Sequence, residues 1–111
     1  GHVDLEIVAG ASDTKRTLAT IKRYHEKFQY LLDPHAAAGV FVAEQYNELD
    51  EPMVCLATAH PAKFPDAIED ATGEDLAHHP MLDALKNAKT RCEVVENNVE
   101  AIKTYLAVRA R

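Results

Sequence analysis

The apolar run Met53-Val54-Cys55-Leu56-Ala57 decides the fold, and the chain continues from it as Thr58-Ala59-His60-Pro61-Ala62-Lys63-Phe64-Pro65. An unbroken apolar run of this length is typical of a β-strand that is covered on both faces in a parallel sheet. The two prolines in the continuation indicate a loop between this strand and a following helix. Because ligands bind beyond the carboxyl ends of strands in open parallel sheets, we expect a binding site at this loop.

The loop offers three candidate functional side chains, Thr58, His60 and Lys63. A purely structural interpretation is also open at this point: Thr58 would cap the strand end, His60 would form a hydrogen bond within the loop, and Lys63 would be solvated. A nucleophilic Ser/His or Cys/His site is not expected, because the thiol of Cys55 should point into the core and no serine lies near His60. The residues alone therefore leave the chemistry of the loop open.

Metal and phosphate-loop sites are not predicted. His78 and His79 are adjacent, so their side chains diverge on most backbones, and we expect both to face solvent. The sequence contains no HExxH spacing and no Gly-rich phosphate loop.

Apolar residues at helical spacing, together with capping residues, predict the helices of the chain. Ser12 or Asp13 caps the first helix. Asp33-Pro34 begins the second helix, whose small residues 36–39 indicate that a strand or a ligand packs very close. The predicted helices span residues 13–28, 34–46, 66–71, 80–85 and 98–108, and short strands are predicted at 3–7 and 91–95 as well as at 53–57. Because strands and helices alternate, we predict the α/β class, with an incomplete sheet.

Composition limits the classes of function. The 111 residues are 47% hydrophobic and 27% charged, which predicts one folded domain or one piece of a domain. The net charge of -6 argues against nucleic acid or an anionic membrane as a partner. No apolar run approaches the roughly 20 residues of a transmembrane helix. Cys55 and Cys92 lack CxxC spacing, so we expect reduced, buried thiols, which fits a cytosolic or stromal setting.

Two strings in this sequence resemble the C-terminal signature of the bacterial and fungal threonine synthase family. They read Leu56-Ala57-Thr58-Ala59-His60-Pro61-Ala62-Lys63-Phe64-Pro65 and, earlier in the chain, Leu32-Asp33-Pro34-His35-Ala36-Ala37-Ala38-Gly39. The resemblance runs from about Ser12 to Leu106. The chain departs from the family pattern at Ala36, where threonine is usual, and at Ala38, where valine is frequent. Both departures keep the site small, so they bear on local packing more than on identity.

The resemblance implies a fold and a reaction. The fold is the C-terminal part of a tryptophan-synthase-like enzyme of fold type II, a partial three-layer sandwich with parallel strands and flanking helices. The reaction uses pyridoxal 5'-phosphate to convert O-phospho-L-homoserine and water to L-threonine and phosphate, in cytoplasmic threonine biosynthesis. In this family a serine or threonine at the end of a late strand hydrogen-bonds the pyridine nitrogen of the cofactor, and Thr58 is the matching position. His35, His60 and Lys63 lie in matching motifs and are expected to shape the site.

The resemblance also implies parts that have no match in this sequence. The family's cofactor-carrying lysine and its Asn/Gly-rich phosphate loop belong to an N-terminal portion. We therefore expect residues 3–111 to be a C-terminal segment, after Gly1 and His2 as a cloning remnant, that needs the N-terminal part of the same chain and neither holds the cofactor nor catalyses alone. Two alternatives stay open: a threonine-synthase-like phospholyase, and a non-enzymatic α/β module that binds a partner through helices 13–28 and 98–108.

Overall fold

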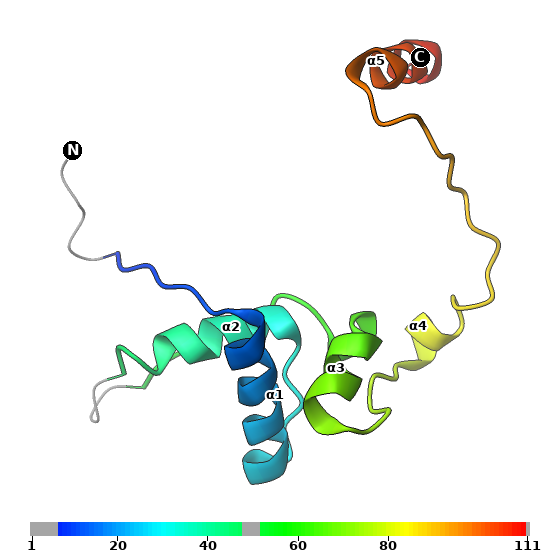
Figure 1. Cartoon of the computed structure of the whole chain (residues 1–111). Coiled ribbons are helices and arrows are strands. Elements are labelled where there is room, and N and C mark those ends of the chain that lie inside the picture. The colour runs from blue at the N-terminus through cyan, green and yellow to red at the C-terminus, as the bar shows by residue number, and fades with distance from the viewer. Residues whose placement is uncertain (1–6, 48–51, 111) are drawn as a thin grey trace.

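The computed structural model describes residues 7–47 and 52–110 of the chain. In this part the elements are α1 (Thr14–Phe28), α2 (Pro34–Ala43), the 3₁₀ turn η1 (Pro61–Lys63), α3 (Pro65–Thr72), α4 (Pro80–Asp83) and α5 (Val99–Arg109). Figure 1 shows α1, α2 and α3 grouped together, whereas α5 stands apart at the end of a drawn-out segment.

Side-chain caps begin α1, α2 and α5, and the sequence predicts those of α1 and α2. The carboxylates of Asp13 and Asp33 and the amide oxygen of Asn98 accept hydrogen bonds from backbone N–H groups of the first turns of α1, α2 and α5. These N–H groups have no partner inside their own helix, so each cap satisfies a donor that would otherwise need water.

The helix ends differ by a few residues from the prediction. Helix α2 ends at Ala43, and a turn takes the place of its expected last residues through Tyr46. Helix α4 ends at Asp83 and is followed by further turns. Helix α3 stops at Gly73 as expected, where φ is 76°. This left-handed conformation is open to glycine because it has no Cβ to clash with the backbone.

The buried core lies among α1, α2 and α3. Ile21 of α1 and Ile68 of α3 are fully buried, and the small side chains of Ala36 and Ala37 let α2 pack closely on α1. The close neighbour of residues 36–39 is therefore helix α1, where the sequence predicts a strand or a ligand. On the other side, a Cβ added at Gly39 would meet no atom within 4 Å in the described part of the chain. The core consists of Ile21, Leu32, Ala36, Ala37, Val40, Ile68, Ala71 and Ala77.

The expected strands do not form in the described residues. Residues 53–57 and 91–95 have no ladder pairing, and residues 3–6 of the first predicted strand lie outside the described ranges. Val54 and Leu56 are 80% and 79% exposed, and the free thiols of Cys55 and Cys92 are exposed, contrary to their predicted burial. A strand needs a neighbour for its N–H and C=O groups, and the described chain brings none to residues 53–57. The described part is thus helical, and the expected sheet is not present in it.

The chain as a whole is far from compact. Its radius of gyration is 19.4 Å, whereas a compact domain of this length would have about 13 Å. None of the described residues of α5 is buried, whereas α1 buries Thr20 and Ile21. None of the helices in the described part is both long and apolar enough to span a bilayer.

Candidate functional site

Asp33 anchors the first of the two motif strings, residues 32–39, at the start of α2. Its side chain is buried, and Oδ1 accepts hydrogen bonds from the backbone N–H of His35 at 2.9 Å and of Ala36 at 3.4 Å. Pro34 occupies the first helical position, where its missing N–H leaves no bond unmade. The arrangement rigidly holds the backbone of the motif, because a buried carboxylate is stable only when its oxygens find donors.

His35 connects this motif with the second one. Its ring Nδ1 lies 3.3 Å from Oδ1 of Asp33, and since this oxygen already accepts from backbone amides, the ring nitrogen is placed to donate to it. The same ring packs against the ring of Phe64, with the centroids 5.1 Å apart and the planes tilted by 56°. The two strings that are separate in the sequence therefore meet in space at the N-termini of α2 and α3.

His60 shapes the loop that holds the other candidate residues. Its Nδ1 accepts a hydrogen bond from the backbone N–H of Ala62 at 3.1 Å, so the ring caps the 3₁₀ turn η1. The backbone N–H of Lys63 donates to the carbonyl of His60 at 3.0 Å and closes the turn. The hydrogen bond predicted for His60 within the loop is confirmed.

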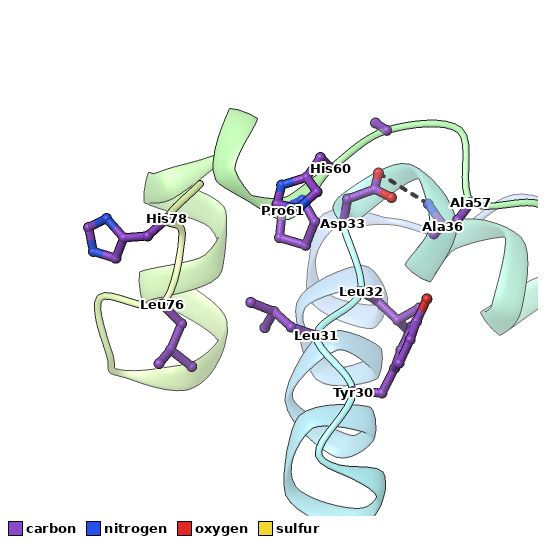
Figure 2. A pocket seen from close by; sticks show the side chains of 11 residues that line it. Tyr30, Leu31, Leu32, Asp33, Ala36, Ala57, His60, Pro61, Leu76 and His78 are labelled. Atoms are coloured by element: carbon purple, nitrogen blue, oxygen red, sulfur yellow. Dashed lines mark hydrogen bonds between the residues drawn. The ribbon is translucent and has the colours of Figure 1, made fainter. Parts of the chain in front are cut away.

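A cavity of about 420 Å³ lies between the two motifs. This volume falls in the range of about 300–1,000 Å³ that is usual for small-molecule sites. Figure 2 shows its lining, with the hydrogen bond from Ala36 to Asp33 drawn dashed and the ring of His78 pointing away from the other side chains. The lining residues are Tyr30, Leu31, Leu32, Asp33, Ala36, Ala57, Ala59, His60, Pro61, Leu76 and His78.

The structure places the four predicted site residues unequally around this cavity. His60 lines it directly, and His35 lies in the sequence between the lining residues Asp33 and Ala36. Thr58 is exposed and lies between two lining residues, Ala57 and Ala59. Lys63 is exposed at the end of η1 and does not line the cavity. In the described ranges no group of three or more His, Cys, Asp or Glu side chains is placed to hold a metal ion.

The sequence predicts that His78 and His79 both face solvent, but in the structure only His78 is exposed. The exposed ring of His78 lies between two carboxylates, with Nε2 at 3.1 Å from Asp75 and Nδ1 at 3.5 Å from Asp83. The ammonium of Lys86, 2.9 Å away, lowers the pKa of Asp83, and His78 acts in the same direction. His79 is only partly exposed, and its Nδ1 accepts from the N–H of Met81 at 3.3 Å. The prediction of a solvent-facing pair is therefore wrong for His79.

The sequence contains a pattern that predicts the capping role of His79. His79-Pro80 repeats the pair His60-Pro61, and a polar side chain directly before a proline is a common start of a helix. Both pairs begin a helical turn in the structure. The contact between the two rings, whose centroids are 5.0 Å apart, depends on tertiary structure and has no sequence signal.

An ion-pair network fixes α1 against the end of α2 behind the site. Arg23 donates to Oε1 of Glu44 at 2.9 Å, and the hydroxyl of Tyr24 donates to the same oxygen at 3.0 Å. The hydrogen bond from Arg23 lowers the pKa of Glu44, although partial burial opposes this shift. Burial raises the pKa of Tyr24, and its hydrogen bond to Glu44 adds to this shift. The network holds together the two helices whose connection forms one wall of the cavity.

Comparisons with known proteins show which family this chain resembles. The family described as threonine synthase, C-terminal, matches residues 36–106. Threonine synthase of Methylobacillus glycogenes is 37% identical over 103 residues, covering 93% of this chain and 22% of that protein. Threonine synthase of Corynebacterium glutamicum is 35% identical over 99 residues, covering 88% of this chain and 21% of that protein. The chain thus spans about a fifth of the length of these relatives.

A solved structure shows the same arrangement of the chain. The crystal structure of threonine synthase from Brucella melitensis with bound pyridoxal phosphate superposes with a TM-score of 0.76 and is 41% identical. The superposition covers 92% of this chain and 22% of that one. The chain belongs to the threonine synthase family, and its residues 36–106 match the C-terminal region of that family.

Proposed function

We propose that this chain is the C-terminal part of a pyridoxal-phosphate-dependent threonine synthase and forms one wall of its cofactor site. The whole protein would convert O-phospho-L-homoserine and water to L-threonine and phosphate. The observation that carries this proposal is the meeting of the two family motifs around one cavity, through the contact of His35 with Phe64 and the shared lining by Asp33 and His60. The identity of 41% to a threonine synthase with bound pyridoxal phosphate supports the choice of cofactor.

The exposed apolar segment 53–57 supports the proposal that a sheet is completed by other polypeptide. Val54 and Leu56 turn large apolar surfaces to solvent, which soluble proteins seldom do with neighbouring residues. In the whole protein, strands from the remaining polypeptide would pair with this segment and cover both of its faces. The C-terminal segment would then complete a three-layer sandwich of parallel strands and flanking helices, and Thr58 would stand at the carboxyl end of a buried strand.

Thr58 fits the role of a partner for the pyridine nitrogen. It is exposed beside the cavity, and a hydroxyl can accept or donate a hydrogen bond. Pyridoxal phosphate supplies an electron sink to the reaction, and the group that faces its ring nitrogen tunes the strength of that sink. Unlike a carboxylate, the hydroxyl of Thr58 carries no charge that would hold the ring nitrogen protonated. His35, His60 and Lys63 would shape the wall around it.

Two further parts of the cofactor site would come from outside these 111 residues. The lysine that carries the cofactor and the loop that binds its phosphate would come from the N-terminal portion. The 111-residue chain alone would then neither hold the cofactor tightly nor turn over substrate. Its partner in the site would be that portion of the same protein.

A reconstitution experiment tests the proposal. The chain is mixed with the N-terminal portion of the same protein and with pyridoxal phosphate, and the absorbance band of lysine-bound cofactor is recorded. We expect the band from the reconstituted pair and not from the chain alone. Tight association of the two parts without the band would contradict the proposal and favour a non-enzymatic interaction module.

The reaction itself needs a separate measurement. The full-length protein is incubated with O-phospho-L-homoserine, and the products are separated. We expect L-threonine and phosphate in equal amounts. A 2-oxo acid in place of threonine would instead identify a phospholyase with the same fold.

A further inference from the structure

Two His-Pro pairs in this chain cap helical turns in the same way. Nδ1 of His60 accepts from the backbone N–H of Ala62 at 3.1 Å, and Nδ1 of His79 accepts from the N–H of Met81 at 3.3 Å. A backbone N–H only donates, so Nδ1 must be unprotonated in both rings, and a neutral ring then carries its proton on Nε2. Each ring is therefore held in one tautomer and one orientation by the turn that follows it.

The two rings also contact each other. Their centroids lie 5.0 Å apart and their planes are inclined by 74°, which is the edge-to-face geometry that aromatic pairs favour. His60 belongs to the loop before α3, whereas His79 belongs to the loop before α4, so the contact joins two loops that are separate in the sequence. Both rings border the same small apolar depression together with Met81 and Leu82.

His79 is the better anchored member of the pair. Its backbone N–H donates to Oδ2 of Asp83 at 3.1 Å, and the other oxygen of Asp83 lies 2.9 Å from the ammonium of Lys86. The ring of His79 is thus fixed at both its backbone and its Nδ1 atom. The ring of His60 is more exposed and packs against the ring of His79.

We propose that His79 is a positioning residue for the loop of the candidate site. Its ring holds the ring of His60 in the orientation that caps η1, and it thereby sets the backbone from Thr58 to Lys63. The importance of the His79 ring for catalysis rests on the function proposed above. The physical coupling of the two rings is independent of that function. His79 acts through His60 and does not line the cavity between the two motifs.

Amide hydrogen exchange in the 111-residue chain tests the coupling. The variant His79→Asn keeps a side-chain acceptor for the N–H of Met81 but removes the ring. We expect exchange at the Ala62 amide to rise about two- to tenfold, because an aromatic pair contributes about 0.5–1.5 kcal/mol and about 1.4 kcal/mol corresponds to a factor of ten. Exchange at the Met81 amide should stay close to that of the wild type.

Two further variants separate the ring contact from other effects. His79→Phe keeps a ring but removes the acceptor, so exchange should rise at Met81 and remain closer to wild type at Ala62 than in His79→Asn. His25→Asn, on α1, should change neither amide. Unchanged exchange at Ala62 in His79→Asn would overturn the proposal. An equal rise at the core amide of Ile21 would also overturn it, because it would indicate general destabilisation.

The exchange experiment requires neither cofactor nor partner. If it succeeds and the two parts associate tightly without a cofactor band, the proposed function fails while the positioning role of His79 stands. If the band appears and Ala62 exchange does not respond to His79→Asn, only the positioning role is wrong.

Discussion

Thr58 and Asp33 represent two kinds of residue in the candidate site. The hydroxyl of Thr58 is exposed next to the cavity, so its removal should leave the packing of this chain intact. The carboxylate of Asp33 is buried and bound to the backbone, so its removal should affect folding first. Substitutions at the two positions therefore separate a functional from a structural contribution.

The variant Thr58→Val nearly preserves side-chain shape while it deletes the hydroxyl. In the full-length protein we expect turnover to fall by about tenfold or more, which corresponds to the loss of one hydrogen bond of about 1.4 kcal/mol, together with a shifted cofactor absorbance band. The melting temperature should stay nearly constant. Steady-state kinetics and spectra of this variant are compared with Thr104→Val on α5 as a control. Wild-type turnover in Thr58→Val would refute the assignment.

The variant Asp33→Ala removes the cap of α2 from a buried position. We expect a loss of about 1–2 kcal/mol in the free energy of unfolding, as for other N-cap deletions. Asp33→Asn keeps an oxygen acceptor and should cost less. Urea unfolding of the 111-residue chain measures both, with Asp13→Ala as an exposed cap for comparison. Equal losses in the Asn and Ala variants would show that the cap hydrogen bonds are not the cause.

At the scale of elements, the contact of α1 with the end of α2 should depend on pH. The pKa of Glu44 is lowered in the folded chain, chiefly by the hydrogen bond from Arg23. A carboxyl with a lowered folded pKa contributes stability above its unfolded pKa of about 4.3 and loses it as pH falls through the folded value. The contribution is at most about 1 kcal/mol, because both side chains are more than a third exposed and the pair is screened by solvent.

The variant Glu44→Gln tests this dependence. It should be less stable than the wild type at pH 7, and the difference should shrink as pH falls below about 4.3, the unfolded pKa. Urea midpoints at several pH values measure the effect, and Glu26→Gln, whose partner Lys22 lies at 3.8 Å on the same helix, is the control. A difference that is independent of pH would contradict the assigned ion pair.

The elements also show where local sequence rules hold. The helices begin at their predicted caps because a cap is decided by a few neighbouring residues, as at Asp13 and Asp33. The segment 53–57 has the sequence of a buried strand, yet it lies exposed and unpaired in the described chain. Its pattern encodes burial on two faces, and the burial itself requires strands that come from elsewhere.

At the scale of the whole molecule, the α1–α3 core and α5 should be energetically independent. None of the described residues of α5 is buried, and an isolated helix of 11 residues is marginal in water. Truncation after Thr90 should therefore change the free energy of unfolding of the core by less than about 0.5 kcal/mol. The variant Ile68→Val, within the core, should cost about 1 kcal/mol and serves as the positive control. Urea unfolding measures the stability of the truncated chain and of Ile68→Val, and exchange of the α1 amides reports on the core in each. A large loss on truncation would show that α5 packs on the core.

The family, the helix starts and the residues of the two motifs could be predicted from the amino-acid sequence, because each depends on residue identity or on neighbours within one turn. The folded chain was needed to show that His35 meets Phe64, that His79 contacts His60, and that the cavity is bounded by the α1–α2 connection. These contacts join residues far apart in the chain, and α2 and α3 come together because both pack on α1. The same reason explains the missing sheet: strand pairing is a contact between distant segments, and apolar residues alone cannot supply the partner.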